Sequence, residues 1–427
     1  MKRHVLIVVL LVFGTTSPLQ AQSAPTLFVG NQGLFGADNG SITAINPASG
    51  QRSNGFSGVE SLIQDVAVHP DGVVIVTANT SDRVDAFSQS DGAFLWTTTG
   101  ISMPRYVAFY QDRVLITSHA GTGGDGEVVV LALSDGQITG RIGVGAVPEG
   151  LAVVGDRAWV AHFNYGADST ISVIDLPSMT LQDTYDMGCN GPRFLAHGPQ
   201  SDVWVVCMGR VQYNADYSEI MATYPASVSV RDADNPAVEI AAFPLETVAG
   251  GAALGQDVHA SGGRLGILMA DRVIMFDQAD RSRLDDLLLP GADFAGAVLV
   301  DGKATWVTRF ASFTSAGRVE ALSTSGEVIT AFEAGLIPAA LALSGASAVA
   351  RSEHTMDMRP TPKAYPNPTD AQWTLPTYAD GEVVIYDMLG RVVLRTDDAV
   401  VDVAHLPTGT YVIRYPTGLT ELGGIVR

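Results

Sequence analysis

The sequence predicts an all-β protein: a seven-bladed β-propeller, with six or eight blades also compatible, followed by a small Ig-like β-sandwich. Three observations predict this architecture. A strand-rich pattern recurs at a period of about 40–45 residues, which is typical of propeller blades of four strands each. A single extra strand follows the last full repeat, where it can close the ring. The composition then changes, and short alternating strands fill the rest of the chain.

The repeated unit is clearest at residues 114–140. There an apolar strand, a polar loop, a second apolar strand, an Asp-Gly turn and a third strand follow one another. Asp-Gly favours a tight hairpin because glycine accepts a positive φ. The other full copies begin at Leu27, Val73, Ala158 and Thr305, and a weak copy spans Gly266–Phe276.

The residue that follows the leading strand of each copy gives a register. If these residues are equivalent, they lie on one rim near the central opening, so Asn79, His119, His162 and Arg309 are candidate rim residues. Two imidazoles from neighbouring blades could begin a metal site, but a stable site needs three or four ligands. The sequence therefore favours polar residues that anchor loops, and predicts no metal at this position. The full register reads Asn31, Asn79, His119, His162, Met208 and Arg309.

The strand that precedes each copy predicts how the ring closes. It begins with proline at Pro104, Pro148 and Pro192. A further copy, Ile337–Ala342, has no full blade after it, and the unit at Leu27 lacks this strand. We expect the returning strand to join the first unit, since this removes an exposed sheet edge. Closure favours seven blades, while Val349–Ser352 leaves an additional unit open.

The residues that open the innermost strands face the central channel in propellers and are candidate ligand-binding residues. Mixed acids and arginines at a channel mouth could hold a polar ligand through bidentate contacts. They could equally form salt bridges that lock adjacent blades. The candidates at the channel mouth are Asp65, Arg105, Glu149, Arg193 and Asp257.

A long insertion, Gly209–Pro225, is a second candidate binding element. It carries Tyr213, Tyr217 and Tyr224 and is longer than the corresponding loops of the other units. Long loops often carry binding residues. The alternative is that its aromatic rings pack the loop onto the propeller.

The first residues predict export from the cytoplasm. A positive start is followed by the apolar run Val5–Phe13 and a small, polar stretch that ends at Ala21, which predicts a signal peptide over residues 1–22. The apolar run is shorter than the roughly 20 residues that span a bilayer, and no transmembrane segment is expected after it. In an oxidising compartment Cys189 and Cys207 are candidates for a disulfide, the alternative being two buried thiols.

Composition and motifs narrow the function classes. With 45 acidic against 25 basic residues the net charge is −20, which would repel nucleic-acid phosphates and anionic lipid. No serine-nucleophile elbow, HExxH zinc motif, haem motif or phosphate loop is present. We expect no cofactor. Calcium binding by loop residues Asp38, Asp125 and Asp168 is an alternative to their capping of turns, which we favour.

The repeats resemble bacterial YVTN-type propellers, also called surface-layer or lactonase-like propellers. The resemblance rests on the patterns P-x-x-[IVL]-A, [WL]-V-x-[NH] and S-V-I-D, and covers residues 25–352. It implies a propeller. It leaves the function open, since that family includes binding proteins, lyases and lactonases.

A proline-rich linker, residues 353–364, precedes a C-terminal segment, residues 365–427, that resembles the sorting domain of type IX secretion cargo. The matching stretches are Tyr365–Thr369, Val384–Val393, Leu406–Arg414 and Ile425–Arg427. The resemblance implies export across the outer membrane, then removal of the domain with anchoring or release. Such domains often end in lysine, whereas this chain ends in arginine; an ordinary Ig-like binding module is the alternative. The resemblance assigns sorting roles to Tyr386, Asp387, Gly390, Arg391, Pro407, Gly409 and Tyr411.

We therefore expect a secreted or cell-surface propeller that binds a protein or glycan without catalysis. The alternative is an extracellular enzyme of the lactonase or lyase type with acid–base residues in the channel. A catalytic channel should contain a carboxylate or histidine of strongly shifted pKa beside a deep pocket. A binding surface should instead expose aromatic residues on the loop 209–225.

Overall fold

The computed structural model describes two compact units, Met1–His354 and Thr355–Arg427. The predicted signal peptide and the predicted linker lie outside the described residues. The described ranges are 25–53, 56, 58–59, 61–119, 125–214, 219–245, 254–291, 293–344, 372–374, 383–387, 392–396, 398, 400–407, 409–414 and 420–425.

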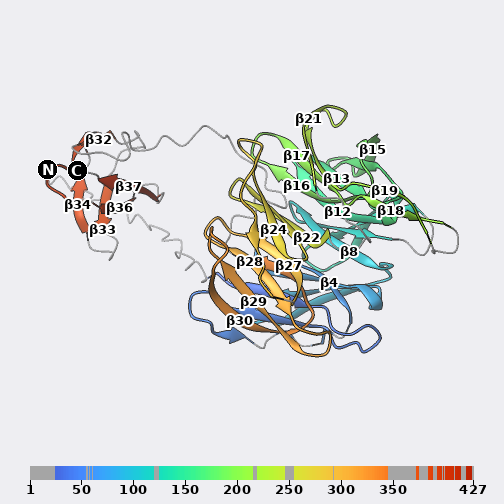
Figure 1. The fold of residues 1–427 in the computed structure, drawn as a ribbon. Coiled ribbons are helices and arrows are strands. Elements are labelled where there is room, and N and C mark those ends of the chain that lie inside the picture. The colour runs from blue at the N-terminus through green and yellow to red at the C-terminus, as the bar shows by residue number, and fades with distance from the viewer. Residues whose placement is uncertain are drawn as a thin grey trace, which may run out of the picture. The chain divides into compact units, whose positions relative to one another are not determined.

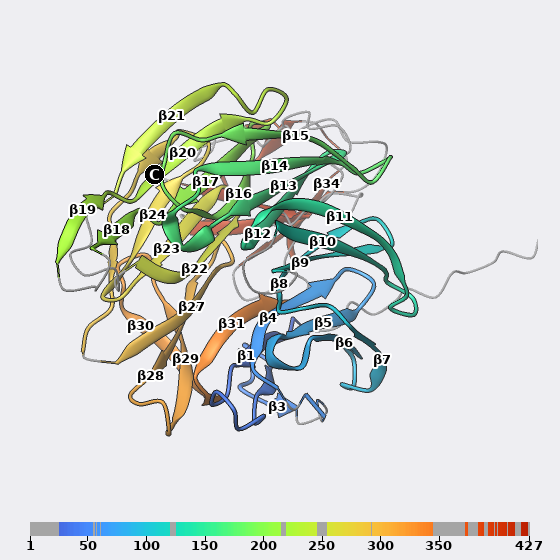
Figure 2. The same ribbon diagram turned by 90° about the vertical axis from the view of Figure 1, so that its right-hand side faces the viewer.

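The first unit is a β-propeller of seven antiparallel sheets, here numbered as blades in chain order (Figures 1 and 2). Blade 1 contains β1 (Leu27–Asn31), β2 (Ser41–Ile45), β3 (Arg52–Ser53) and β31 (Pro338–Leu343). Blade 2 contains β4 (Ile63–His69), β5 (Val73–Ala78), β6 (Arg83–Ser88) and β7 (Phe94–Thr99). Blade 3 contains β8 (Pro104–Tyr110), β9 (Arg113–Ser118), β10 (Asp125–Ala132) and β11 (Ile138–Ala146). Blade 4 contains β12 (Pro148–Val154), β13 (Arg157–His162), β14 (Thr170–Asp175) and β15 (Thr180–Asp186).

Blades 5 and 6 depart from the simple four-stranded plan. Blade 5 contains β16 (Pro192–Gly198), β17 (Asp202–Cys207), β20 (Ser227–Asp232) and β21 (Glu239–Pro244), with a separate hairpin of β18 (Arg210–Tyr213) and β19 (Ile220–Tyr224) inserted. Blade 6 contains β22 (Leu254–Ser261), β23 (Arg264–Met269) and β24 (Arg272–Asp277), and both β25 (Ser282–Arg283) and β26 (Leu287–Leu288) pair with β24. Blade 7 contains β27 (Phe294–Val300), β28 (Thr305–Phe310), β29 (Ala316–Leu322) and β30 (Val328–Leu336). Two 3₁₀ turns, η1 (Asn79–Ser81) and η2 (Asn164–Gly166), lie in loops.

The ring closes as the sequence predicts. Strand β31 returns from the end of the propeller and pairs antiparallel with β1, from Leu27 opposite Leu343 to Asn31 opposite Pro338. In Figure 2 the orange β31 lies beside the blue β1 at the inner end of blade 1. The prediction of seven blades is thereby confirmed, and the weak copy at 266–276 is blade 6.

Burial follows the position of each strand in its blade. All residues of β17 are buried, because neighbouring blades cover both faces of a blade. The outermost strands are largely exposed, as in β15. Trp204 of blade 5 stacks on Phe243 of its own blade and contacts Phe276 of blade 6, with ring centroids 5.8 and 5.6 Å apart. Apolar contacts of this kind between blades make up the core.

Near the axis the blades are joined by polar contacts. The innermost strands carry a bulge close to their start, and a threonine of the second strand fills it in blades 2 and 7. Thr77 accepts the backbone N–H of Asp65 at 2.9 Å and donates to the carbonyl of Arg105 in blade 3, also at 2.9 Å. Thr308 likewise donates to the carbonyl of Pro338 at 2.6 Å. These bonds fix the starts of the innermost strands, which line the channel mouth.

The second unit contains two small sheets. β32 (Gln372–Thr374) pairs with β35 (Val400–Asp402), and the second sheet has the order β34 (Val392–Thr396), β33 (Val383–Asp387), β36 (Gly409–Arg414) and β37 (Thr420–Ile425). Side chains from both sheets, among them Val401 and Ile413, form one buried cluster. Among the sorting residues, Tyr411 is buried and donates its hydroxyl to the carbonyl of Pro407 at 2.6 Å. Gly390, Arg391 and the side chains of Tyr386 and Asp387 lie outside the described residues.

Candidate functional site at the channel mouth

The links between blades and the loops between the second and third strands lie on the same face of the propeller. The innermost strands start, and the second strands end, at the same end of every blade, so the links between blades meet the loops between second and third strands there. We call this the top face. Its loops are the described parts of 32–40, 79–82, 119–124, 163–169, 208–226, 270–271 and 311–315.

A cavity of about 380 Å³ opens at the centre of the top face, a size at the lower end of ligand pockets. Arg105 and Arg193, from the starts of β8 and β16, line it on one side. Phe294, Phe310 and Phe313 line it from blade 7, whereas Arg105 belongs to blade 3, across the ring, and Arg193 to blade 5, two blades away. Their rings form one cluster with centroids 5.2–5.7 Å apart. The mouth thus has an aromatic wall and a cationic wall.

A network of charged groups connects blades 2 to 5 at this mouth. Glu149 of β12 is 3% exposed and lies 2.9 Å from Arg105 Nη2 and 3.7 Å from Arg193 Nε. Arg105 also donates to Gln64 Oε1 at 2.6 Å, and His119 Nε2 lies 3.3 Å from the Glu149 carboxylate. Burial raises the pKa of Glu149, but Arg105, a hydrogen bond from His119 and Arg193 together outweigh it and lower this pKa to about 2. Glu149 is therefore a fixed negative charge.

The two candidate aspartates, Asp65 and Asp257, link neighbouring blades instead of joining the charge network. Asp65 Oδ2 accepts the backbone N–H of Val107 in the next blade at 3.0 Å. Asp257 Oδ2 accepts that of Val298, also in the next blade, at 3.2 Å. Each Oδ1 accepts the N–H of the following residue at 2.9 Å. Four of the five candidates line the cavity, and the fifth, Glu149, contacts Arg105 and Arg193. The five divide into three members of a charge network and two links between blades.

The register that made His119 equivalent to His162 is wrong by one residue. The residues paired with the last residue of the innermost strand before its bulge are Asn31, His162 and Arg309 in blades 1, 4 and 7, whereas in blade 3 this position is Ser118. His119 and Asn79 come one position later. The error arose because small residues at strand ends, such as Ser118, hide where the ladder stops.

His162 joins blades 3 and 4 rather than facing the channel. Its ring is fully buried, and Nε2 accepts the backbone N–H of Gly145 at 3.0 Å. Nδ1 is 2.8 Å from the hydroxyl of Thr170, which in turn donates to Asp168. Burial lowers the pKa of His162 to about 4, against the opposing pull of Asp168. The equivalent Asn31 accepts the N–H of Gly335 at 2.8 Å, so the same position serves the same role in another blade.

The remaining rim candidates also bind backbone. Asn79 donates to the carbonyl of Pro104 at 3.1 Å, and Arg309 donates to those of Pro290 and Asp293. Asp168, one of the loop acids considered for calcium, accepts two backbone N–H groups and a hydroxyl within its own turn. Among the described residues, no three His, Cys, Asp or Glu side chains gather as a metal site.

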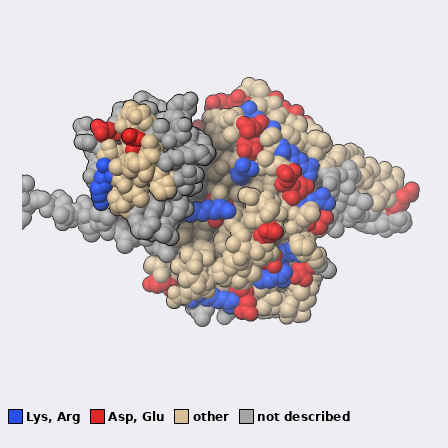
Figure 3. All heavy atoms as spheres, turned by 60° about the vertical axis from the view of Figure 1, so that its left-hand side comes forward, with Lys and Arg blue, Asp and Glu red and all other residues tan. Residues whose placement is uncertain are grey.

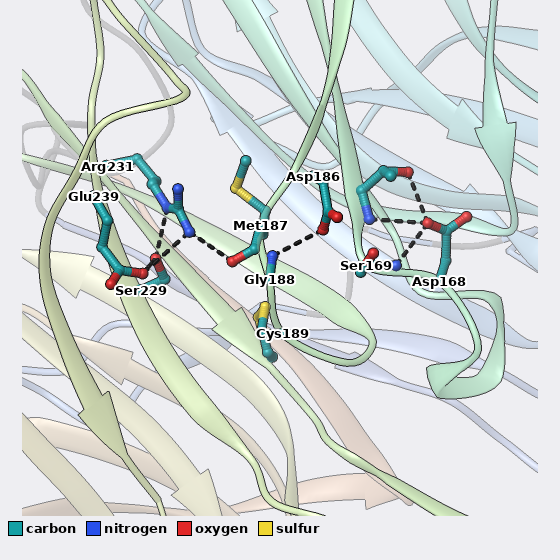
Figure 4. The surroundings of a disulfide bond; sticks show 11 residues. Asp168, Ser169, Asp186, Met187, Gly188, Cys189, Ser229, Arg231 and Glu239 are labelled. Carbon is teal, nitrogen blue, oxygen red and sulfur yellow. Dashed lines mark hydrogen bonds and ion pairs between the residues drawn. A yellow bond between two sulfur atoms is a disulfide. The ribbon is translucent and has the colours of Figure 1, made fainter.

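The link from blade 4 to blade 5, which precedes Arg193 in the chain, is held by a disulfide and by hydrogen bonds (Figure 4). Cys189 in this link and Cys207 at the end of β17 form a disulfide, with their Cα atoms 6.1 Å apart. Figure 4 also shows Arg231 of β20 donating to the carbonyl of Met187 at 2.6 Å, while Asp186 accepts the N–H of Gly188 at 2.8 Å. These contacts fix the segment that leads into β16 and thereby position Arg193.

Apolar side chains are exposed on the loops of the top face. The insertion forms the β18–β19 hairpin, on which Ile220, Met221 and Tyr224 are exposed. Tyr217 and the side chain of Tyr213 lie outside the described residues. Tyr165, Phe35 and Phe313 of other top-face loops are also exposed, at 76%, 86% and 54%. Sequence reasoning missed the phenylalanines of blade 7, although the stretch 310–313 places two aromatic rings at the end of the second strand and just after it, and blade 4 carries Phe163 and Tyr165 just after its second strand.

The charge of the propeller surface is distributed rather than concentrated. On the face drawn in Figure 3, acidic and basic side chains are interspersed among uncharged ones. Many of the cations are paired, as in the Arg52–Glu333 contact of 3.0 Å. In the described part of the chain, no helix has the length and apolar character to span a membrane.

Comparison with known proteins bears on the two units differently. Residues 363–422 match the family model described as "Secretion system C-terminal sorting domain". The chain resembles hydrazine synthase of Kuenenia stuttgartiensis at 15% identity and a TM-score of 0.50, over 65% of this chain and 88% of that one. BamB of Moraxella catarrhalis aligns at 13% identity and a TM-score of 0.44, over 73% and 89%. No curated protein has a matching sequence.

At 15% identity, the likeness to hydrazine synthase shows only a shared fold. The YVTN-type assignment stays a prediction, since the family match lies in the C-terminal unit. That match implies export through the type IX secretion system, with release from the cell or attachment at its surface. The chain is therefore a seven-bladed propeller followed by a type IX sorting domain.

Proposed function

We propose that the exported propeller is a binding protein that uses its top face, without catalysis, to hold a ligand outside the cell. The observation that carries the proposal is the cavity at the channel mouth, which is lined by phenylalanines from blade 7 and by Arg105 and Arg193 from blades 3 and 5. Exposed apolar groups on the surrounding loops, such as Met221 and Tyr165, extend the contact surface beyond the cavity.

The protonation states at the mouth favour binding over acid–base chemistry. A general acid or base works best when its pKa lies near the operating pH. Burial raises the pKa of Glu149, but Arg105, His119 and Arg193 lower it to about 2, so this carboxylate stays charged at neutral pH. His162, with its pKa of about 4, is enclosed between blades and committed to the N–H of Gly145. Neither group is suited to shuttle protons for a lactonase or lyase.

The test compares binding with turnover. The purified protein is applied to glycan and peptide arrays and incubated with a panel of lactones. We expect array ligands whose binding falls at least tenfold in a Phe313→Ala, Met221→Ser double variant. Phe94→Ala, which removes an exposed ring from the outermost strand of blade 2, is the matched control and should bind normally. Binding that survives the double variant, or hydrolysis of a lactone that Glu149→Gln abolishes, would overturn the proposal.

A further inference from the structure

Several hydrogen-bond donors at the channel mouth have no acceptor in the part of the chain that the structure describes. Within the described part of the chain, the guanidinium of Arg193 makes no hydrogen bond: it has the 3.7 Å ion pair with Glu149 and lies over the rings of Phe163 and Phe194 at 5.1 and 5.0 Å. The amide nitrogen of Gln64 and the hydroxyl of Tyr106, both at the cavity, have no acceptor among those residues either. A ligand that brings acceptor oxygens would satisfy these groups.

The acidic groups at the mouth are already engaged. Asp65 and Asp257 accept backbone N–H groups of the following blades, and Glu149 is shared by Arg105, His119 and Arg193. Arg105 and Arg193 share Glu149, and among the described residues only Arg105 also has a hydrogen bond, to Gln64. A carboxylate supplied by a ligand could accept two parallel hydrogen bonds from Arg193.

The aromatic wall supplies flat apolar surface next to these donors. Phe294 and Phe310 are stacked with their planes 26° apart, and Phe313 lies 5.2 Å from Phe294. Phe294 and Phe313 are each about half exposed. Such a surface suits the C–H face of a pyranose ring, whose hydroxyl groups point outward toward donors placed around the ring. The volume of about 380 Å³ suits one or two sugar residues better than a folded partner.

We propose that the channel mouth binds an acidic sugar, a pyranose that carries a carboxylate, as a free oligosaccharide or the end of a polysaccharide. The carboxylate pairs with Arg193, the ring lies on Phe313 and Phe294, and Gln64 and Tyr106 donate to ring hydroxyls. This inference rests on the proposed function and names its ligand class. An acidic peptide with an aromatic side chain also has a carboxylate and a flat group, but fewer acceptors to match the donors around the mouth.

The experiment varies the ligand before the protein. Trigalacturonate, its methyl ester and a neutral galactose trisaccharide are titrated calorimetrically into the full chain in the presence of a chelator. We expect the free acid to bind at least tenfold more tightly than the ester and the neutral sugar, because a charge-assisted contact is worth about 1.5–3 kcal/mol. Equal affinity for acid and ester would overturn the proposal without any question of protein folding.

Variants then locate the contact. Arg193→Gln should remove the preference for the acid, whereas Phe313→Ala should weaken acid and ester by the same factor. The controls are Arg52→Gln and Phe94→Ala. They change an exposed arginine and an exposed phenylalanine that do not line the cavity. An acid preference that persists in folded Arg193→Gln would overturn the proposal.

The outcomes also separate this inference from the proposed function. If no sugar binds but an acidic aromatic peptide does, and Phe313→Ala abolishes that binding, the ligand class is wrong and the binding function stands. If array ligands bind independently of Phe313 and Met221, both are wrong. A melting temperature for each variant shows whether lost binding reflects lost folding.

Discussion

Replacing His162 with asparagine should remove one component of the acid sensitivity of the propeller while leaving the fold intact. His162 accepts the N–H of Gly145 and, through Nδ1, contacts Thr170. Asn31 accepts the N–H of Gly335 at the same position of blade 1. An amide at residue 162 can therefore replace the buried imidazole, and it does not titrate.

The magnitude follows from the pKa of the histidine. Burial lowers this pKa from 6.5 to about 4, so the unfolded chain takes up the proton first as the pH falls. The stability that neutral His162 contributes is complete above pH 6.5 and is lost as the pH drops toward 4. At pH 4.5 the loss relative to pH 7 is about 2.5 kcal/mol, an upper figure if the site relaxes. Protonated Nε2 would also point its hydrogen at the N–H of Gly145.

The assay is denaturant unfolding of both proteins at pH 7 and pH 4.5. All other titrating groups are common to the two proteins, so their effects cancel in the difference. We expect His162→Asn to be less stable at pH 7 by about 1–2 kcal/mol, for lost volume, and to recover or exceed the wild-type stability at pH 4.5. If the stability difference between the two proteins is the same at both pH values, the account of the buried neutral imidazole is refuted.

Three further predictions concern the ring and the export of the chain. Gly150→Ala should lower the free energy of unfolding by about 1–3 kcal/mol, because the added Cβ would lie 2.7 Å from the carbonyl oxygen of Arg193. Gly143→Ala is the control, since a Cβ there meets open space and should leave the free energy of unfolding unchanged. Equal effects of the two substitutions would contradict the close approach of blades 4 and 5. Cys189→Ser should lower the free energy of unfolding by about 3 kcal/mol, as expected for a short loop, and reductant should lower the wild type equally but leave the variant unchanged. Deletion of residues 363–422 should leave the propeller inside the outer membrane, as cell fractionation would reveal; normal appearance outside would contradict a sorting role.

Local pattern sufficed for the architecture because each repeat carries its own strand and turn signals. The unpartnered strand at 337–342 and the missing strand at Leu27 together predicted closure, and the pairing of β31 with β1 confirms it. The starts of the innermost strands are also recognisable in the sequence, which is why it predicts Arg105, Glu149 and Arg193 together at the channel mouth.

The use of each polar group depends on the neighbouring blade and could not be read from one repeat. The carboxylate of Asp65 accepts the backbone N–H of Val107, a contact that exists only once two blades are packed. The aromatic wall joins Phe294 of strand β27 and Phe313 of the loop after β28, so no single motif marks it. The one-residue offset between His119 and His162 could not be read from the repeats either, because the residue at which each second strand stops pairing depends on its partner strand.

The central claim is that the channel mouth holds a carboxylate-bearing sugar between Arg193 and the phenylalanines of blade 7. A crystal structure of the protein soaked with trigalacturonate tests it most directly. The account predicts a sugar ring stacked on Phe313 with its carboxylate within hydrogen-bond distance of Arg193. A ligand bound elsewhere on the propeller, or an empty mouth at saturating concentration, would contradict it.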